Sequence, residues 1–286
     1  MNAVAALNDL GKQASYSESG ANILISSPAG EFCDDPSPTA NATTTVDLSG
    51  TLGDNNNGKN GTDTDYPNDN YTKCFNGTSS ATPLVSGVAA LVLEANSNLT
   101  RRDMRVLLAR TARKNDPADV DWTVNSAGRN INHKYGFGAI DASAAVAAAK
   151  SWTLLGSEKT PETYSSTTTP VAIADSPGPE GTFGAVSTNE INVPITSSIS
   201  QLEFVDITVT SDHPFWSDLE IVLTSPSGTK SVLTSHHIPA KCFAAATCTG
   251  TKALSAGWRF GSVRHLDEPA TGDWSLAARD GGAGDT

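Results

Sequence analysis

The segment from Phe75 to Asn96 reads FNGTSSATPLVSGVAALVLEAN and places a cluster of hydroxyl side chains directly before a long run of small apolar residues. A helix that is apolar on nearly all sides is expected to be buried. Pro83 lies in its first turn, where the missing N–H costs little. We therefore expect a buried helix from about Ser79 to Ala95. Thr78 or Ser79 either caps this helix or holds its hydroxyl at the positive end of the helix dipole.

Shorter patterns on both sides of this helix predict the other elements of the first half. The apolar runs Ala3–Leu7 and Ile23–Ile25 are typical of short buried strands. Thr100 precedes a second helical pattern, and Asp103 stands where the acid of a capping box would stand. An alanine-rich helix is expected over Asp141–Trp152, capped by its first residue. Strands and helices in this order predict an α/β domain.

The second half of the chain changes to the two-residue period of strands. Its stretch LEIVLTSPSGTKSVLTS reads as two strands around a Pro-Ser-Gly turn. Apolar side chains alternate in two further stretches, at Val205, Ile207 and Val209 and at Trp274, Leu276 and Ala278. These patterns predict an all-β sandwich or jelly roll.

The composition between these halves suggests the domain organisation. Residues 153–189 are rich in Thr, Ser, Pro and Gly, which is typical of a linker and an edge strand. We therefore expect an α/β part over residues 1–152, a linker and domain edge over 153–189, and a β-sandwich over 190–286. A length of 286 residues is sufficient for two cores.

Charge and hydropathy exclude two classes of function. The formal net charge is -12 and the pI is near 4.7, so the chain lacks the basic surface that nucleic-acid binding requires. The longest apolar run, Val88–Leu93, is far shorter than the ~20 residues of a membrane span, so we expect no span. No signal sequence follows Met1. The protein therefore acts inside the cell, or this sequence begins downstream of the true start.

The four cysteines fall as one pair in each half, without the CxxC spacing or neighbouring histidines of a zinc site. We expect the local disulfides Cys33–Cys74 and Cys242–Cys248, as in an exported protein. Free buried thiols are the alternative.

The stretch from Phe32 to Lys73 is polar, rich in turns and longer than ordinary ordered loops. It offers hard oxygen ligands for calcium at Asp54, Asn56, Asp63, Asp65 and Asp69. The order of an EF-hand, with its closing Glu, is missing. A solvated polar loop is therefore the alternative to a calcium site.

The motif NGTSSATP and the helix after it resemble the nucleophile segment of subtilisin-like serine proteases. That family's pattern is Gly-Thr-Ser-x-Ala-(Ser/Thr/Ala)-Pro followed by a helix of small residues. The matching positions are Gly77, Thr78, Ser79, Ala81, Thr82 and Pro83.

The resemblance extends over nearly the whole chain apart from the polar loop and the linker. The stretches LTRRDMRVLLARTARKND and HKYGFGAIDASAAVAAAKSW are most similar to the kexin and proprotein-convertase branch, in which the protease is followed by a β-rich P domain, also called homo B. The stretches SDLEIVLTSPSGTKSVL and DEPATGDWSLAARD resemble that P domain. The resemblance implies the C-terminal part of a parallel-sheet peptidase domain, a secreted protein with its signal peptide upstream, protein or peptide substrates, and structural calcium.

Carried over to this chain, the resemblance makes Ser79 the nucleophile of an endopeptidase. The family's triad runs Asp, His, Ser along the chain, so both partners must precede Ser79. No histidine precedes it, because all five lie downstream, at His133, His213, His236, His237 and His265. Four of the aspartates that precede the serine lie in the wrong segments for the triad, namely Asp9, Asp34, Asp35 and Asp47. The chain is therefore expected to be an incomplete, inactive portion that lacks the N-terminal part and ends within or at the close of the P domain.

Two other interpretations remain open at this stage. An α/β-hydrolase would place the base after the serine and pair Ser79 with Asp116 or Asp121 and with His133. The motif does not fit its Gly-x-Ser-x-Gly elbow, because Ala81 holds the last position. A non-catalytic module is the other interpretation, in which the β-sandwich binds a partner and the first half is a degenerate protease-like scaffold.

Overall fold

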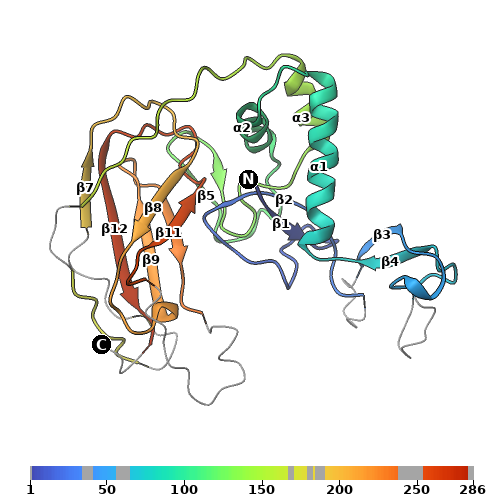
Figure 1. The fold of residues 1–286 in the computed structure, drawn as a ribbon, viewed down its shortest axis with the longest axis horizontal. Helices are drawn as coiled ribbons and strands as arrows, with labels where there is room; N and C mark the ends of the chain where they lie inside the picture. The colour runs from blue at the N-terminus through green and yellow to red at the C-terminus, as the bar shows by residue number, and fades with distance from the viewer. Residues whose placement is uncertain are drawn as a thin grey trace. The chain divides into compact units, whose positions relative to one another are not determined.

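The computed structural model describes residues 2–33, 41–55, 65–166, 171–178, 183, 191–237 and 254–282. The chain forms two compact units, which are shown in Figure 1 and are described separately below. Unit 1 comprises Met1–Ser19, Ile23–Thr123 and Asn130–Ser157, and unit 2 comprises Gly20–Asn22, Val124–Arg129 and Glu158–Thr286. The division into residues 1–152, 153–189 and 190–286 stays a prediction.

Unit 1 is built around a parallel sheet. Strands β1 (Ala3–Leu7) and β2 (Ile23–Pro28) pair in parallel. A third extended segment lies parallel to β2, because Ser26 donates its N–H to the Gly138 carbonyl at 2.9 Å and accepts that of Ile140 at 2.8 Å. The expected α/β class with a parallel sheet is confirmed.

A glycine makes this third segment possible. Gly136 has φ +63°, and a Cβ there would stand 2.4 Å from the backbone carbonyl of Leu24 in β2. Only a residue without a side chain allows the two backbones to approach this closely. The glycines of the HKYGFG motif therefore serve the sheet.

Three helices complete the described part of unit 1: α1 (Thr78–Ala95), α2 (Arg101–Thr111) and α3 (Ala142–Lys150). Both caps expected from the sequence are present. The Thr100 hydroxyl and the Asp103 carboxylate form a reciprocal capping box at the start of α2. Asp141 accepts the N–H of Ala144 at 2.8 Å at the start of α3.

The expectation that α1 is buried on nearly all sides is wrong for the described structure. Its buried residues are Ser80, Ala81, Val85 and Val92. Large apolar side chains on its other sides are exposed, namely Leu84 (43%), Leu91 (50%) and Leu93 (42%). The reason is that α1 packs through one side against β1, β2 and α3. Its remaining sides contact little else in the described chain.

The expectation that no segment could span a membrane also needs a qualification. By length and composition, α1 could cross a membrane, with a mean hydropathy of 1.2 over its 18 residues. It is the one described helix with this property. A core helix of a globular domain passes the same test, but only 22% of this window is buried, because α1 packs on β1, β2 and α3 through one side.

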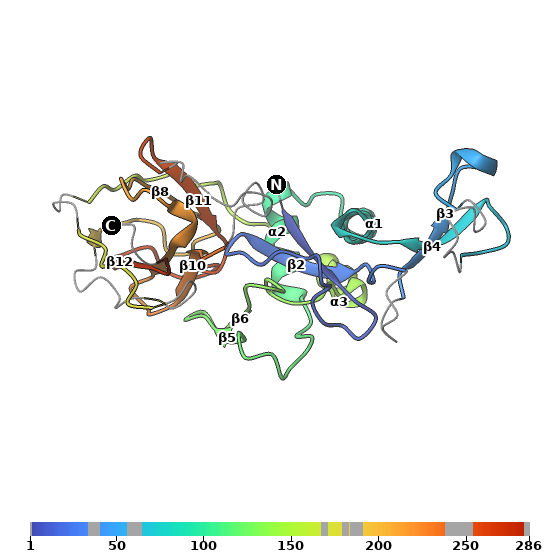
Figure 2. The ribbon, with the colours of Figure 1, turned by 90° about the horizontal axis from the view of Figure 1, so that it is seen from below.

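The polar stretch of unit 1 forms a projecting pair of strands, β3 (Thr43–Val46) and β4 (Tyr71–Phe75), with a short 3-10 turn over Gly50–Leu52. We call the segment between Cys33 and Cys74 the arm. It lies next to the N-terminal end of α1 in both Figure 1 and Figure 2. The predicted disulfide Cys33–Cys74 is present. The other predicted pair, Cys242–Cys248, lies outside the described residues.

Unit 2 is a β-sandwich, as expected. One antiparallel sheet has the order β10-β9-β12-β7, and β11 pairs with β8 in the second. The strands are β7 (Ile191–Ile195), β8 (Val205–Val209), β9 (Leu219–Thr224), β10 (Lys230–Thr234), β11 (Trp258–Ser262) and β12 (Gly272–Asp280), with a 3-10 turn at Trp216–Asp218. The two-residue period of β9 buries Leu219, Ile221 and Leu223. Trp274 of β12 packs in one cluster with Leu223, whereas Leu219 and Ile221 belong to a second cluster.

A turn from the first half of the sequence is part of unit 2. It connects the short paired strands β5 (Thr123–Val124) and β6 (Asn130–Ile131). Its Asn125 side chain is buried and donates to the carbonyls of Arg264 at 3.0 Å and Leu266 at 2.9 Å. The sandwich core of unit 2 is thus completed by residues far away in sequence.

Candidate active site

Ser79 lies in the first turn of α1, directly after β4, and is exposed. Gly77 precedes the helix with φ +82° and ψ 171°, a conformation essentially restricted to glycine. This glycine turns the chain sharply from β4 into α1. Among the described residues, the Ser79 hydroxyl has no hydrogen-bond partner. The result is an accessible hydroxyl at the positive end of an 18-residue helix, where negative charge is stabilised.

The residues that follow Ser79 anchor this turn. The Ser80 side chain is 2% exposed, and its hydroxyl lies 2.8 Å from that of Thr43 in β3. Ala81 is fully buried in a cluster with Ala6, Ala14 and Ala29. Small side chains are needed here because the first turn of α1 packs directly onto the sheet.

Tyr16 lies close to the backbone of Gly77 in this turn. Its hydroxyl donates to the carbonyl of Gly30 at 2.5 Å, and its ring packs edge-on against Phe32 with centroids 5.3 Å apart. Burial raises the pKa of Tyr16; the backbone N–H of Gly77 opposes this increase, and the nearby Glu31 carboxylate adds to it. The phenol therefore stays neutral and lies close to the backbone that precedes Ser79.

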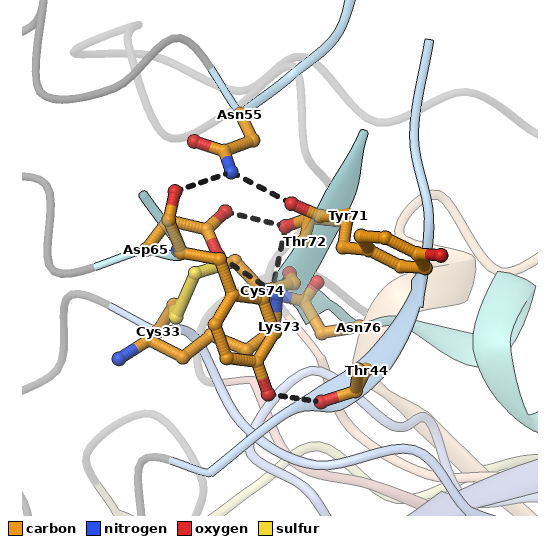
Figure 3. Close-up of a disulfide and its surroundings, with 10 residues drawn as sticks. Cys33, Thr44, Asn55, Asp65, Tyr71, Thr72, Lys73, Cys74 and Asn76 are labelled. Carbon is orange, nitrogen blue, oxygen red and sulfur yellow. Dashed lines mark hydrogen bonds between the residues drawn. A yellow bond between two sulfur atoms is a disulfide. The ribbon is translucent and has the colours of Figure 1, made fainter. Parts of the chain in front are cut away.

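Figure 3 shows the base of the arm around the Cys33–Cys74 disulfide. Its centre is Asn55, which is fully buried and donates to the carbonyls of Tyr66 at 2.9 Å and Tyr71 at 2.6 Å. Asp65 accepts the Thr72 hydroxyl at 2.6 Å and the Lys73 N–H at 2.8 Å. Burial acts to raise the pKa of Asp65, but these hydrogen bonds lower it below its usual value. The polar residues of the arm are thus an internal hydrogen-bond framework.

These hydrogen bonds involve Asp65, which is one of the predicted calcium ligands. Both carboxylate oxygens of Asp65 already accept protein donors. Asp54 and Asp69 are described, whereas Asn56 and Asp63 lie outside the described residues. The described part of the chain holds no group of three or more acidic, histidine or cysteine side chains arranged for a metal. Because Ca²⁺ also binds backbone and amide oxygens, calcium in this loop stays a prediction.

His133, the histidine of unit 1, forms no hydrogen bond with Ser79 in the described structure. His133 lies in unit 1, and its Nδ1 atom is 3.0 Å from the Asp121 carboxylate. Asp116, the other acid considered from the sequence, instead accepts the Tyr135 hydroxyl at 3.2 Å. The other four histidines belong to unit 2. Ser79 thus lies between Gly77 and Ser80, whose hydroxyl contacts Thr43, and no described base of unit 1 bonds to Ser79.

Unit 2 contains an arrangement that imitates a hydrolytic triad. The Ser231 hydroxyl is 3.0 Å from His265 Nε2, and His265 Nδ1 is 3.3 Å from the Glu268 carboxylate. All three residues are no more than 1% exposed, so no substrate can reach them. Burial lowers the pKa of His265. Burial acts to raise that of Glu268, but bonds from His265, Thr229 and Ser126 lower it to about 2. This group is a buried polar network, and no sequence motif predicts it.

Two family models match the chain, one in each half. The subtilase family matches residues 2–138, and the proprotein convertase P-domain matches residues 202–286. Proprotein convertase subtilisin/kexin type 6 of Rattus norvegicus is 35% identical over 209 residues, which cover 71% of this chain and 20% of that protein. Furin-1 of Xenopus laevis is 34% identical over 212 residues, which cover 72% of this chain and 24% of that protein.

A solved structure matches the chain over almost its full length. The serine protease of Aeromonas sobria, solved in complex with its chaperone, superposes with a TM-score of 0.78 at 30% identity and covers 98% of this chain. The chain spans 50% of that protease. These matches exclude the α/β-hydrolase interpretation. With a subtilase part followed by a P domain, this chain belongs to the subtilisin-like serine proteases of the proprotein-convertase type.

Proposed function

We propose that this chain carries the nucleophile of a serine-type endopeptidase and that the nucleophile is Ser79. The supporting observation is its position: an exposed hydroxyl in the first turn of α1, within the segment matched by the subtilase family. Ser79 Oγ attacks the scissile peptide carbonyl while a histidine takes its proton, and the leaving amine receives that proton. Water then hydrolyses the acyl-enzyme and regenerates the hydroxyl.

We propose that three catalytic groups come from a part of the protein that precedes this chain. They are the triad Asp, the triad His and the asparagine that stabilises the oxyanion in this family. No histidine precedes Ser79 in the sequence. The exposed Leu84, Leu91 and Leu93 of α1 offer that part an apolar surface on which to pack. In subtilisin, loss of the histidine alone lowers kcat by about 2 × 10⁶. This chain by itself is therefore expected to be nearly inert.

The remaining features of the proposal follow from this assignment. Residues 1–152 are the C-terminal portion of a peptidase domain, 153–189 a linker and domain edge, and 190–286 a P domain. The substrates are proteins or peptides. The Cys33–Cys74 disulfide supports an extracellular or periplasmic location, because such bonds persist in oxidising compartments. α1 acts as a core helix and not as a membrane span, and any structural calcium lies outside the described residues or upstream.

The test uses a fluorophosphonate probe, which labels activated serines. The natural protein with its upstream region should be labelled, and Ser79→Ala should abolish labelling. Ser86→Ala is the matched control, because Ser86 is an exposed serine on the same helix, bonded only to the Thr82 carbonyl at 3.1 Å. Labelling that persists in Ser79→Ala would refute the nucleophile assignment.

A non-catalytic binding module is the alternative, favoured by the absence of a histidine before Ser79. It predicts that the full-length protein, correctly folded, shows no labelling and no peptidase activity. The same experiment therefore separates the two functions.

A further inference from the structure

A chain of hydroxyl groups connects the first turn of α1 to the sheet. The Ser80 and Thr43 hydroxyls lie 2.8 Å apart, and the Thr43 hydroxyl donates to the Ala29 carbonyl at 3.3 Å. A hydroxyl has one proton to donate. Because Thr43 uses its proton on Ala29, Ser80 must be the donor to Thr43. The order Ser80–Thr43–Ala29 is thus fixed.

Both ends of this chain are held firmly. Ser80 is 2% exposed, so its hydroxyl cannot turn to water without leaving a buried polar group unpaired. Ala29 is 1% exposed, and its N–H donates to the Leu7 carbonyl of β1 at 2.8 Å. Next to Ala29, Gly30 forms an isolated β-bridge with Ala42, the residue before Thr43. Thr43 therefore stands on a rigid base formed where the arm leaves the sheet.

Ser79 itself lacks such support. Its hydroxyl bonds to no described residue, and Gly77 before it has a backbone conformation that only glycine adopts easily. The direction of Ser79 Oγ consequently depends on the backbone of the first helical turn. Among the described side-chain contacts, the Ser80–Thr43 bond is the one that restrains the residue directly after Ser79.

We infer that Thr43 is a positioning residue for the nucleophile: through Ser80, it fixes the first turn of α1 and aims Ser79 Oγ at the scissile carbonyl. This inference rests on the proposed function of Ser79. Its chemical consequence is large, because a misplacement of about 1 Å at a reacting atom costs on the order of 100-fold in rate. Thr43 would not touch the substrate.

The strand supplies its own control. β3 contains three consecutive threonines, Thr43 to Thr45. Thr44 points away from α1, because its side chain is exposed and its hydroxyl lies 3.0 Å from that of Tyr66 (Figure 3). Thr43→Val and Thr44→Val therefore remove one hydroxyl each from neighbouring positions of one strand, and only the first removes the link to α1.

The experiment measures kcat, KM and the rate of fluorophosphonate labelling in the natural full-length protein. Thr43→Val should lower kcat and the labelling rate by about 10-fold to 100-fold with KM nearly unchanged. Thr43→Ser, which keeps the hydroxyl, should restore kcat to within about 2-fold, and Thr44→Val should resemble the wild type. Unfolding midpoints identify a variant that merely fails to fold.

A double-mutant cycle makes the inference independent of folding. Ser80→Ala removes the same bond from the other side, so Ser80→Ala and Thr43→Val together should lower kcat no more than either change alone. Losses that multiply, or a Thr43→Val variant with wild-type kcat, would overturn the inference. Failure of the proposed function looks different, since the wild type would then show no labelling, or Ser79→Ala would keep it.

Discussion

Cys33 and Cys74 are joined by a disulfide that spans 41 positions of sequence and brings their Cα atoms within 5.1 Å. Cys33 follows the segment that leaves β2, and Cys74 lies in β4, shortly before Gly77 and the start of α1. The bond therefore closes the arm at its base. The disulfide thereby keeps the base of the arm close to Ser79.

Removal of this bond should destabilise unit 1. For a closed loop of this length, a disulfide contributes about 2–4 kcal/mol by restricting the unfolded chain. Cys33→Ser with Cys74→Ser should therefore lower the free energy of unfolding in urea by about that amount. A reducing agent should do the same to the wild type. An unchanged urea midpoint in the double variant would show that the arm holds its base without the bond.

Asp103 should make unit 1 sensitive to acid. This buried carboxylate accepts the Trp152 indole N–H at 3.0 Å and the Leu155 N–H at 2.7 Å. Burial acts to raise its pKa, but these bonds and those from Thr100 lower it from 3.8 to about 2. A lowered folded-state pKa means that the stabilisation, about 2 kcal/mol, is complete above pH 3.8 and is lost as the pH falls toward 2.

Asp103→Asn tests this carboxylate directly. The variant should lose about 1.5–3 kcal/mol at neutral pH, because hydrogen bonds to a charged acceptor are lost. Between pH 4 and pH 2, the free energy of unfolding should also decrease less in the variant than in the wild type. Urea unfolding at each pH measures this decrease. Glu94→Gln, which removes an exposed charge from α1, is the control and should change neither quantity. Identical pH profiles for Asp103→Asn and wild type would contradict the assignment.

Two glycines should respond to alanine in opposite directions. At Gly30, with φ +84°, an added Cβ would stand 2.2 Å from the Asn41 carbonyl oxygen, so Gly30→Ala should destabilise unit 1 by several kcal/mol. At Gly87, inside α1, an added Cβ meets nothing within 4 Å. Gly87→Ala should therefore stabilise the protein by about 0.5–1 kcal/mol. Thermal unfolding of the two variants measures both effects. Unfolding temperatures that shift in the same direction in both variants would contradict the packing described here.

Asn125→Asp should severely weaken unit 2. The Asn125 amide donates to two carbonyls, those of Arg264 and Leu266, while its oxygen accepts the N–H of Arg129 at 2.9 Å. A carboxylate keeps the acceptor but sets a buried negative charge against both carbonyls. The expected loss is at least about 3 kcal/mol. Asn98→Asp, at an exposed asparagine, is the matched control for urea unfolding. A loss below about 0.5 kcal/mol for Asn125→Asp would contradict this contact.

The sequence predicted those features that short-range physics determines. The helix starts at Thr100 and Asp141 followed from capping side chains, and the strands of unit 2 followed from alternation such as Val205, Ile207 and Val209. The Cys33–Cys74 pair followed from the even distribution of cysteines. Ser79 was singled out by a motif; it is exposed at the start of α1, and its role as the nucleophile stays a prediction.

Features that depend on residues distant in sequence were beyond such reasoning. The composition of α1 predicted burial on nearly all sides, but composition does not say which sides meet a partner. The network of Ser231, His265 and Glu268 assembles from β10 and the turn before β12, so no local spacing indicates it. Likewise, Thr43 looked like any polar strand residue until its hydroxyl was found beside Ser80.

The turn at residues 124–129 has a consequence for how this architecture can evolve. Unit 2 includes this turn and also Gly20–Asn22, so its parts are interleaved with those of unit 1 along the chain. The buried Glu268 carboxylate, for example, accepts the Ser126 N–H at 2.9 Å. A single recombination breakpoint near residue 158 would deprive that carboxylate of one of its donors, the Ser126 N–H. We therefore expect that recombination seldom moves the P domain into another gene without the first half of this chain. The two halves are expected to be inherited together.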